Sequence, residues 1–140
     1  MSLIEKTNQN NEILDRVISC FPRIMHALGL GHWDITIEKA FSDGYGQDGT
    51  VTHGEISYDI QRENAHITLY MHSFEEGDDI IEILAHEIAH IFIGHVTGWM
   101  KNSRQIKRYE EYAVTRLTPL VHATINRTLS ENGGECQDVE

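Results

Sequence analysis

The sequence has few prolines, few cysteines and few basic residues. Its 140 residues include 2 Pro, 2 Cys and 11 Lys or Arg, against 22 Asp or Glu. The scarcity of proline, together with 40% hydrophobic residues, excludes a Pro-rich disordered or collagen-like chain and predicts one folded domain. Because the formal charge of −11 repels phosphate groups and anionic lipid surfaces, we expect neither nucleic acid nor a membrane as a partner.

No segment has the pattern of a signal peptide or a membrane span. Residues 1–30 carry acidic and Asn side chains instead of a basic stretch followed by an apolar one. The longest apolar run lies within Ile80–Ile93, which is too short for a span and is interrupted by Glu and His. Cys20 and Cys136 do not provide the disulfide framework of a small secreted domain. We therefore expect a reduced, cytoplasmic protein.

Hydrophobic periodicity predicts helices at both ends of the chain, with strands and one more helix between them. Helical spacing covers Glu12–Leu28, where Pro22 should kink or split the helix. Alternating apolar residues predict strands over Trp33–Glu38, Val51–Ile60 and Ala65–His72, the last two as a hairpin. Later helices are expected from a cap at Ser73 or Asp78 to Gly94, and over about Arg104–Leu129.

This order of elements predicts an α+β fold. We expect about three largely antiparallel strands packed with an N-terminal helix, a middle helix and a C-terminal helix. No linker or repeat divides the chain, so a single domain should cover residues 1–130. Residues 131–140 are polar and acidic and should form a flexible tail.

The middle predicted helix contains the sequence His86-Glu87-Ile88-Ala89-His90, an H-E-x-x-H motif. Its two histidines lie one turn apart on the same side, so their imidazoles can share one Zn²⁺. Apolar residues surround the motif, which predicts that most of this helix is buried. A divalent cation would offset the cost of burying two imidazoles and a carboxylate. The motif therefore predicts a metal site at His86 and His90.

A catalytic zinc needs a third protein ligand and keeps its fourth position for water. The candidates are Glu110 and Glu111, at the start of the last predicted helix. Its apolar residues lie between about −20° and 80° on a wheel of about 100° per residue: Ala113 (the zero), Leu117, Leu120 and Val121. Glu110 lies near 60° on this wheel and Glu111 near 160°. We therefore predict Glu110 as the third ligand and Glu111 as a solvated surface carboxylate.

The chemistry predicted from these residues is hydrolysis of a peptide bond. Zinc would lower the pKa of a bound water toward about 7, and Glu87 would act as the general base. An extended peptide or protein substrate would pair with the free edge of one of the two hairpin strands. His95, Tyr109 and Tyr112 are candidates for stabilising the oxyanion, and Glu82 either orients His86 or is solvated.

A second hypothesis is a non-catalytic protein-binding module whose metal only stabilises the fold. Such a site would have four protein ligands and no bound water, with His95 or Glu111 as the extra ligand. The number of ligands therefore distinguishes the two hypotheses.

The motif residues resemble those of gluzincin-type metallopeptidases. The match consists of His86-Glu87-x-x-His90-x-x-x-Gly94-His95 and then Glu110-x-x-Ala113, and it is similar to the ImmA/IrrE-type and related small bacterial or phage-encoded members. The resemblance covers about Ser73–Pro119 and implies a zincin-like domain. It implies that both histidines and the downstream Glu bind zinc and that the motif Glu is the general base. Because some members cleave a repressor, the resemblance leaves two alternatives: a bacterial or phage regulatory protease, or a free-standing minimal peptidase of the same architecture. Val114 stands where this family often has Asn.

Overall fold

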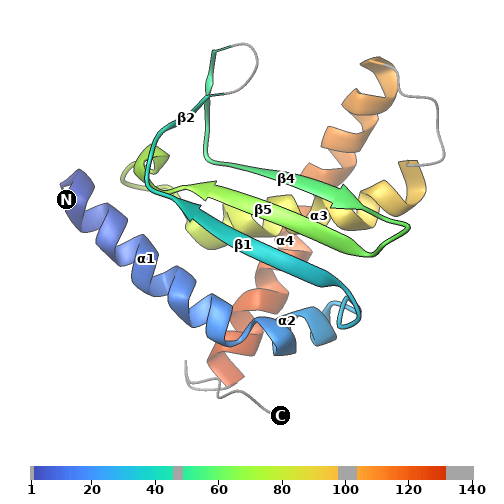
Figure 1. Ribbon diagram of the computed structural model, residues 1–140, viewed down its shortest axis with the longest axis horizontal. Helices are drawn as coiled ribbons and strands as arrows, with labels where there is room; N and C mark the ends of the chain where they lie inside the picture. Colours follow the sequence, from blue (N-terminus) through green and yellow to red (C-terminus); the bar gives the residue numbers. More distant parts are fainter. Residues whose placement is uncertain (1, 46–48, 98–103, 132–140) are drawn as a thin grey trace.

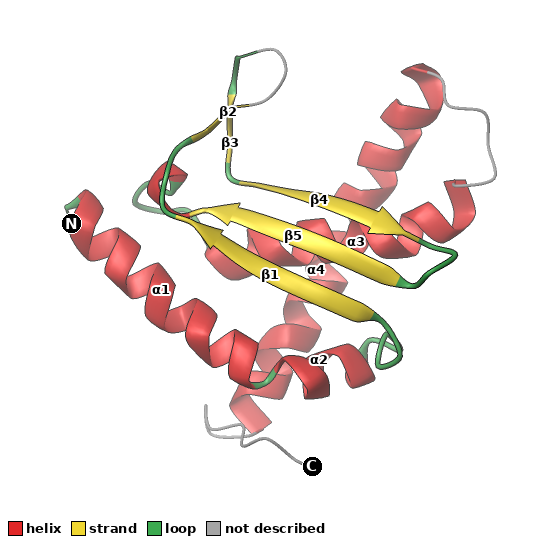
Figure 2. Ribbon diagram, viewed as in Figure 1, coloured by secondary structure: helices red, strands yellow, loops and turns green. Residues whose placement is uncertain are grey.

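The described residues form four α-helices, one short 3₁₀ turn and five strands (Figure 1). The computed structural model describes residues 2–45, 49–97 and 104–131. In chain order the elements are α1 (Leu3–Ser19), α2 (Phe21–Ala27), β1 (Asp34–Ala40), β2 (Gly44–Tyr45), β3 (Val51–Thr52), β4 (Gly54–Asp59), β5 (Asn64–Tyr70), η1 (Met71–Ser73), α3 (Ile80–Thr97) and α4 (Arg104–Glu131). The α+β class is confirmed. Figure 2 shows α3 and α4 behind the main sheet.

The main sheet has the strand order β1-β5-β4, so β5 is central and β4 is an edge strand. β5 is antiparallel to β4, which confirms the predicted hairpin, and parallel to β1. The sheet is therefore mixed, and the prediction of a largely antiparallel sheet was wrong. The short turn before Asn64 makes β4 and β5 antiparallel. β5 then inserts between β4 and β1, and its position beside β1 makes those two strands parallel.

The predicted strand Val51–Ile60 is divided at His53 into β3 and β4. β3 pairs with β2 in a separate two-stranded sheet that extends beyond the main sheet (Figure 1). The main chain at His53 stays tied to β5, because its carbonyl accepts the amide N–H of Tyr70 at 2.9 Å. Residues 46–48 of the expected loop Ser42–Thr50 lie outside the described residues.

The N-terminal helix starts earlier than its periodicity predicts. It begins at Leu3, where the Ser2 hydroxyl accepts the amide N–H of Glu5 at 3.2 Å. The prediction that Pro22 splits the helix is confirmed, since Pro22 lies in the first turn of α2. There its missing N–H removes no helical hydrogen bond.

Asp79 caps the N-terminus of α3. One of its carboxylate oxygens accepts the amide N–H of Ile81 at 2.9 Å and that of Glu82 at 3.3 Å. The prediction of Ser73 or Asp78 as the cap was therefore wrong. Ser73 ends η1, and the Asp78 carboxylate accepts the amide N–H of Glu75 in the preceding loop.

α3 is the central helix of the hydrophobic core. By length and composition alone it could cross a membrane, but such a helix is weak evidence of a membrane protein. It contacts β4, β5 and α4. Its fully buried residues, with those of the neighbouring elements, form a continuous core: Leu14, Val17, Ile24, Ile67, Leu69, Phe74, Leu84, Ile88, Ile91, Val114 and Ile125. The environment of α3 is therefore that of a core helix.

Two further predictions concern the cysteines and the C-terminal tail. Cys20 is buried and disulfide-bonded, contrary to the expectation of a reduced chain, and Cys136 lies outside the described residues. The inference of a reducing compartment therefore has no support at Cys20. The predicted tail also lies outside the described residues, except for Glu131, which ends α4.

Candidate metal centre

α3 and α4 run antiparallel, with polar contacts at both ends of their interface. At one end, the His122 ring and the Asp79 carboxylate are 2.8 Å apart. At the other end, His90 Nε2 lies 3.2 Å from a Glu111 oxygen. This pairing brings the first turns of α4 beside the H-E-x-x-H motif of α3.

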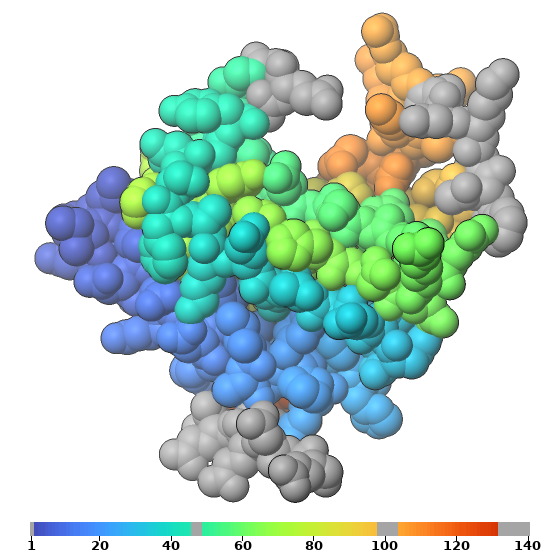
Figure 3. All heavy atoms as spheres, viewed as in Figure 1, coloured from blue at the N-terminus to red at the C-terminus, as the bar shows by residue number. Residues whose placement is uncertain are grey.

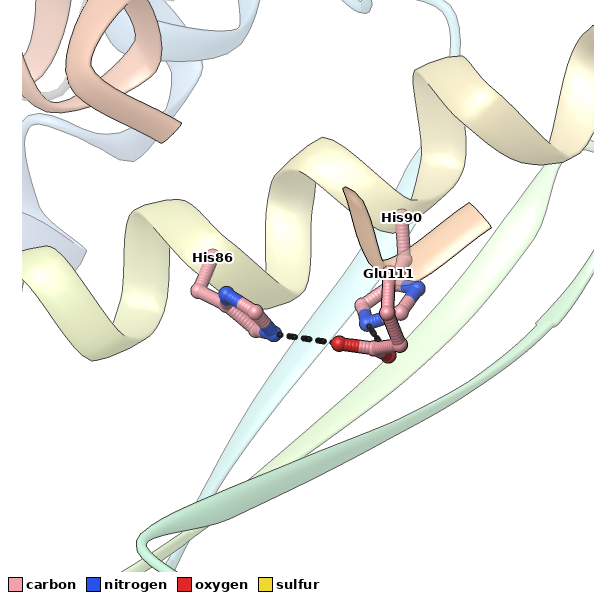
Figure 4. Close-up of side chains that lie close together, drawn as sticks. All are labelled: His86, His90 and Glu111. Atoms are coloured by element: carbon pink, nitrogen blue, oxygen red, sulfur yellow. Dashed lines mark ion pairs between the residues drawn. The ribbon is translucent and has the colours of Figure 1, made fainter. Parts of the chain in front are cut away.

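The motif histidines and Glu111 form one cluster at this interface (Figure 4). His86 Nε2 lies 3.6 Å from one oxygen of Glu111, and His90 Nε2 lies 3.2 Å from the other. The two imidazole rings meet edge to face, with their centroids 5.2 Å apart. One ligand atom from each of the three residues lies within 4.8 Å of the other two, so the three could share one metal ion.

The donor set is one that zinc uses, and the distances from Glu111 to the two histidines are compatible with that ion. Two His nitrogens and one Glu oxygen form one of the known donor sets of catalytic zinc sites. At zinc bond lengths of about 2.1 Å, neighbouring ligand atoms of a tetrahedral site lie about 3.4 Å apart. The two nitrogen-to-oxygen distances to Glu111, 3.6 and 3.2 Å, are close to that value. Three protein donors leave a fourth tetrahedral position for water.

The structure places Glu111, and not the predicted Glu110, with the two histidines. The wheel used for the prediction was rotated, because it counted Leu120 as buried although this residue is 67% exposed. The buried residues of α4 in this region lie between about 80° and 140° on that wheel: Val114, Thr118, Val121 and Ile125. Glu110 and Glu111 therefore flank the buried stripe at about equal angles, and the angular argument does not separate them.

Glu110 lies on the other side of His90. One of its oxygens is 3.6 Å from His90 Nδ1 and accepts a hydrogen bond from the Tyr58 hydroxyl at 3.2 Å. A carboxylate beside Nδ1 favours the tautomer that carries its proton there and leaves Nε2 free to bind a metal. Burial, followed by the charge and the hydrogen bond of Glu110, raises the pKa of Tyr58 to about 12, so this hydroxyl remains a donor.

Glu87 is buried beside the cluster, with 7% of its surface exposed. Burial raises the pKa of Glu87 to about 7, and the charges of Glu111 and Glu55 add to the effect. A carboxyl group with this pKa can exchange a proton near neutral pH, as a general base must. Burial also lowers the pKa of His86, against the opposing charge of Glu111, which favours the neutral imidazole that binds metals.

The candidate oxyanion groups do not join the cluster. His95 is 2.8 Å from the Ile91 carbonyl through Nδ1 and packs edge to face on Trp33. Tyr109 and Tyr112 are exposed, and the Tyr112 hydroxyl accepts hydrogen bonds from Arg116. Glu82 is exposed, and its charge only partly opposes the burial that lowers the pKa of His86.

Sequence reasoning missed the role of Tyr58. A signal was present, because the alternation puts Ile56 and Tyr58 on the face of β4 that packs against the core, and Ile60, just after the strand, packs there too. A buried phenol hydroxyl needs a hydrogen-bond partner.

No family model, curated protein or solved structure matches the chain.

Proposed function

We propose that the chain is a zinc-dependent peptidase in which His86, His90 and Glu111 bind the metal and Glu87 is the general base. The observation that carries the proposal is the convergence of both motif imidazoles on the two oxygens of one carboxylate from α4. The buried Glu87 beside this cluster supports a catalytic site, because a metal that only stabilises the fold does not need a buried carboxylate as a base.

In this mechanism His86, His90 and Glu111 would bind the metal, and Glu87 would transfer the proton. Zinc bound at the cluster would supply an attacking water near neutral pH and polarise the scissile carbonyl. Glu87 accepts a proton from that water as its oxygen attacks the carbonyl carbon. Glu87 then passes the proton to the amide nitrogen as the carbon–nitrogen bond breaks. The negative charge of Glu110, 3.6 Å from His90 Nδ1, favours a proton on that nitrogen.

The free edge of β4 is our choice for the strand that binds an extended substrate. β5 is paired on both sides, whereas β4 pairs only with β5 among the described strands. Tyr58 of β4 contacts Glu110, so this edge lies beside the metal cluster. Figure 3 shows a recess above β4, between the β2/β3 segment and the N-terminal part of α4. A peptide added to this edge would form main-chain hydrogen bonds with β4.

The alternative of a non-catalytic, metal-stabilised binding module predicts a fourth protein ligand. Among the described residues, the group that could hold a metal contains only His86, His90 and Glu111. His95, one of the two extra ligands considered, is held on the Ile91 carbonyl and the Trp33 ring. This arrangement favours an open site, and therefore the peptidase.

The test is a comparison of the wild-type chain with Glu87→Gln, both loaded with zinc. We expect about one zinc per chain in each, hydrolysis of a mixed peptide library by the wild type, and loss of hydrolysis on chelation. We expect Glu87→Gln to keep its zinc and to lose about 10²-fold or more in rate. A zinc-loaded, folded Glu87→Gln protein that hydrolyses peptides at the wild-type rate would contradict the proposal.

A further inference from the structure

A second feature of the α3/α4 interface is a surface pocket of about 340 Å³ next to the metal cluster. Its lining consists of Glu82, Ile83, His86, Thr115, Thr118, Pro119 and His122. His86 belongs to both the pocket and the cluster. His122, hydrogen-bonded to Asp79, marks the end away from Glu111. A substrate side chain close to the scissile bond would therefore reach this pocket.

Most of the polar groups of this lining are already satisfied. The hydroxyl of Thr115 donates to the Glu111 carbonyl, and that of Thr118 donates to the Val114 carbonyl. The His122 ring is engaged by Asp79. Glu82 differs, because among the described residues its carboxylate has no hydrogen bond or ion pair.

Pro119 interrupts the regular hydrogen bonding of α4 beside the pocket. Proline has no amide N–H, so Pro119 cannot donate to the carbonyl of Thr115 four residues earlier in α4. Both residues line the pocket. The pocket walls therefore combine the carbon atoms of Ile83, Pro119 and the threonines with the carboxylate of Glu82.

We propose that this pocket binds a lysine or arginine side chain of the peptide substrate, with Glu82 as the residue that determines specificity. The inference rests on the proposed peptidase function and names its substrate class. The aliphatic stem of such a side chain packs on apolar walls while its charged end donates to acceptors. An acidic side chain would meet the like charge of Glu82, and no Lys or Arg lines the pocket. The volume accommodates most side chains, so charge is the property that selects among them.

The experiment uses three peptides that differ only at one position beside the scissile bond, which carries Lys, Leu or Glu. We measure kcat/KM for the zinc-loaded wild type, Glu82→Gln and Glu82→Lys, with Glu12→Gln on α1 as a control that removes the same charge elsewhere. In parallel, peptide binding to Glu87→Gln and to its double variant with Glu82→Gln is measured by fluorescence anisotropy. This binding measurement does not require hydrolysis.

We expect the wild type to prefer the Lys peptide over the Glu peptide by about tenfold or more. Glu82→Gln should lower kcat/KM for the Lys peptide about three- to fivefold relative to the Leu peptide, since Glu82 is exposed. Glu82→Lys should shift the preference toward the Glu peptide, and Glu12→Gln should match the wild type. Preferences that are the same in all four proteins would overturn the proposal.

The binding measurement separates failure of this inference from failure of the proposed function. If the wild type hydrolyses none of the peptides, the peptidase proposal fails, and binding alone decides the role of the pocket. Tighter binding of the Lys peptide that is lost in the Glu82→Gln double variant supports the pocket. Equal or undetectable binding of the three peptides overturns it.

Discussion

Gly94 of α3 lies directly against the ring of Tyr58. A Cβ added at residue 94 would lie 2.7 Å from the Tyr58 hydroxyl oxygen and 2.7 Å from its Cε2. Real Cβ atoms essentially never approach other atoms this closely. The missing side chain therefore makes room for Tyr58, whose hydroxyl donates to Glu110 beside His90. Gly94, one helical turn after His90, thus allows Tyr58 to reach the carboxylate beside the candidate metal centre.

Replacing Gly94 by alanine tests this contact. Alanine normally stabilises a helix by about 1 kcal/mol relative to glycine. Here we expect Gly94→Ala to destabilise the protein by about 1–3 kcal/mol, because the Tyr58 ring must move. The measurement is urea unfolding at equilibrium. Gly31→Ala is the control, since its added Cβ would have no neighbour closer than 3.6 Å. A Gly94→Ala protein that is more stable than the wild type would contradict the packing argument.

Glu110 and Glu111 are neighbours with different expected effects on zinc affinity. Glu111→Gln removes a charged ligand and should weaken zinc binding more than 100-fold. Glu110→Gln removes the negative charge beside His90 Nδ1 and should weaken zinc binding about 10- to 100-fold, as is typical for groups that orient a ligand. Competition with a chromogenic chelator measures both affinities.

The ¹⁵N shifts of the His90 ring in the metal-free protein provide a second readout for Glu110. We expect the Nδ1-protonated tautomer in the wild type and a mixture in Glu110→Gln. If Glu110→Gln abolishes zinc binding while Glu111→Gln has little effect, the third ligand is Glu110, as the sequence predicted.

Asp79 joins the start of α3 to α4, and its loss should lower stability. Asp79→Ala removes the cap of the helix that carries the motif and the partner of His122. We expect a loss of about 1–2 kcal/mol in the free energy of unfolding. Asp79→Asn, which keeps an acceptor for the amide groups of Ile81 and Glu82, should retain most of the stability. Equal losses in the two variants would show that the acceptor is unimportant.

Local patterns predicted much of the fold. The hairpin of β4 and β5, the division of the first helix at Pro22 and the helix around the motif all follow from periodicity and proline chemistry. The parallel pairing of β1 with β5 does not, because alternation shows that a segment is a strand but not which strand lies beside it. The early start of α1 was missed because residues 5–12 are polar and give no helical periodicity, although Asn10 there is buried.

The sequence predicted one part of the candidate site and missed another. His86, Glu87 and His90 lie within one helical turn, so their relative positions follow from helix geometry alone. The third ligand comes from another helix, and choosing between Glu110 and Glu111 requires the rotation of α4 about its axis. That rotation is set by packing at Val114 and Thr118, which the periodicity did not identify. Tyr58 contributes from a strand, which no motif spacing reveals.

The most direct test of the account is an anomalous diffraction map, collected at the zinc absorption edge from crystals of the zinc-loaded chain. The account predicts one strong peak about 2.0–2.2 Å from His86 Nε2, His90 Nε2 and a carboxylate oxygen of Glu111. It also predicts that the fourth position is open to solvent. A map with no peak at this place, or with a peak held by four protein ligands, would contradict the claim of a catalytic zinc site.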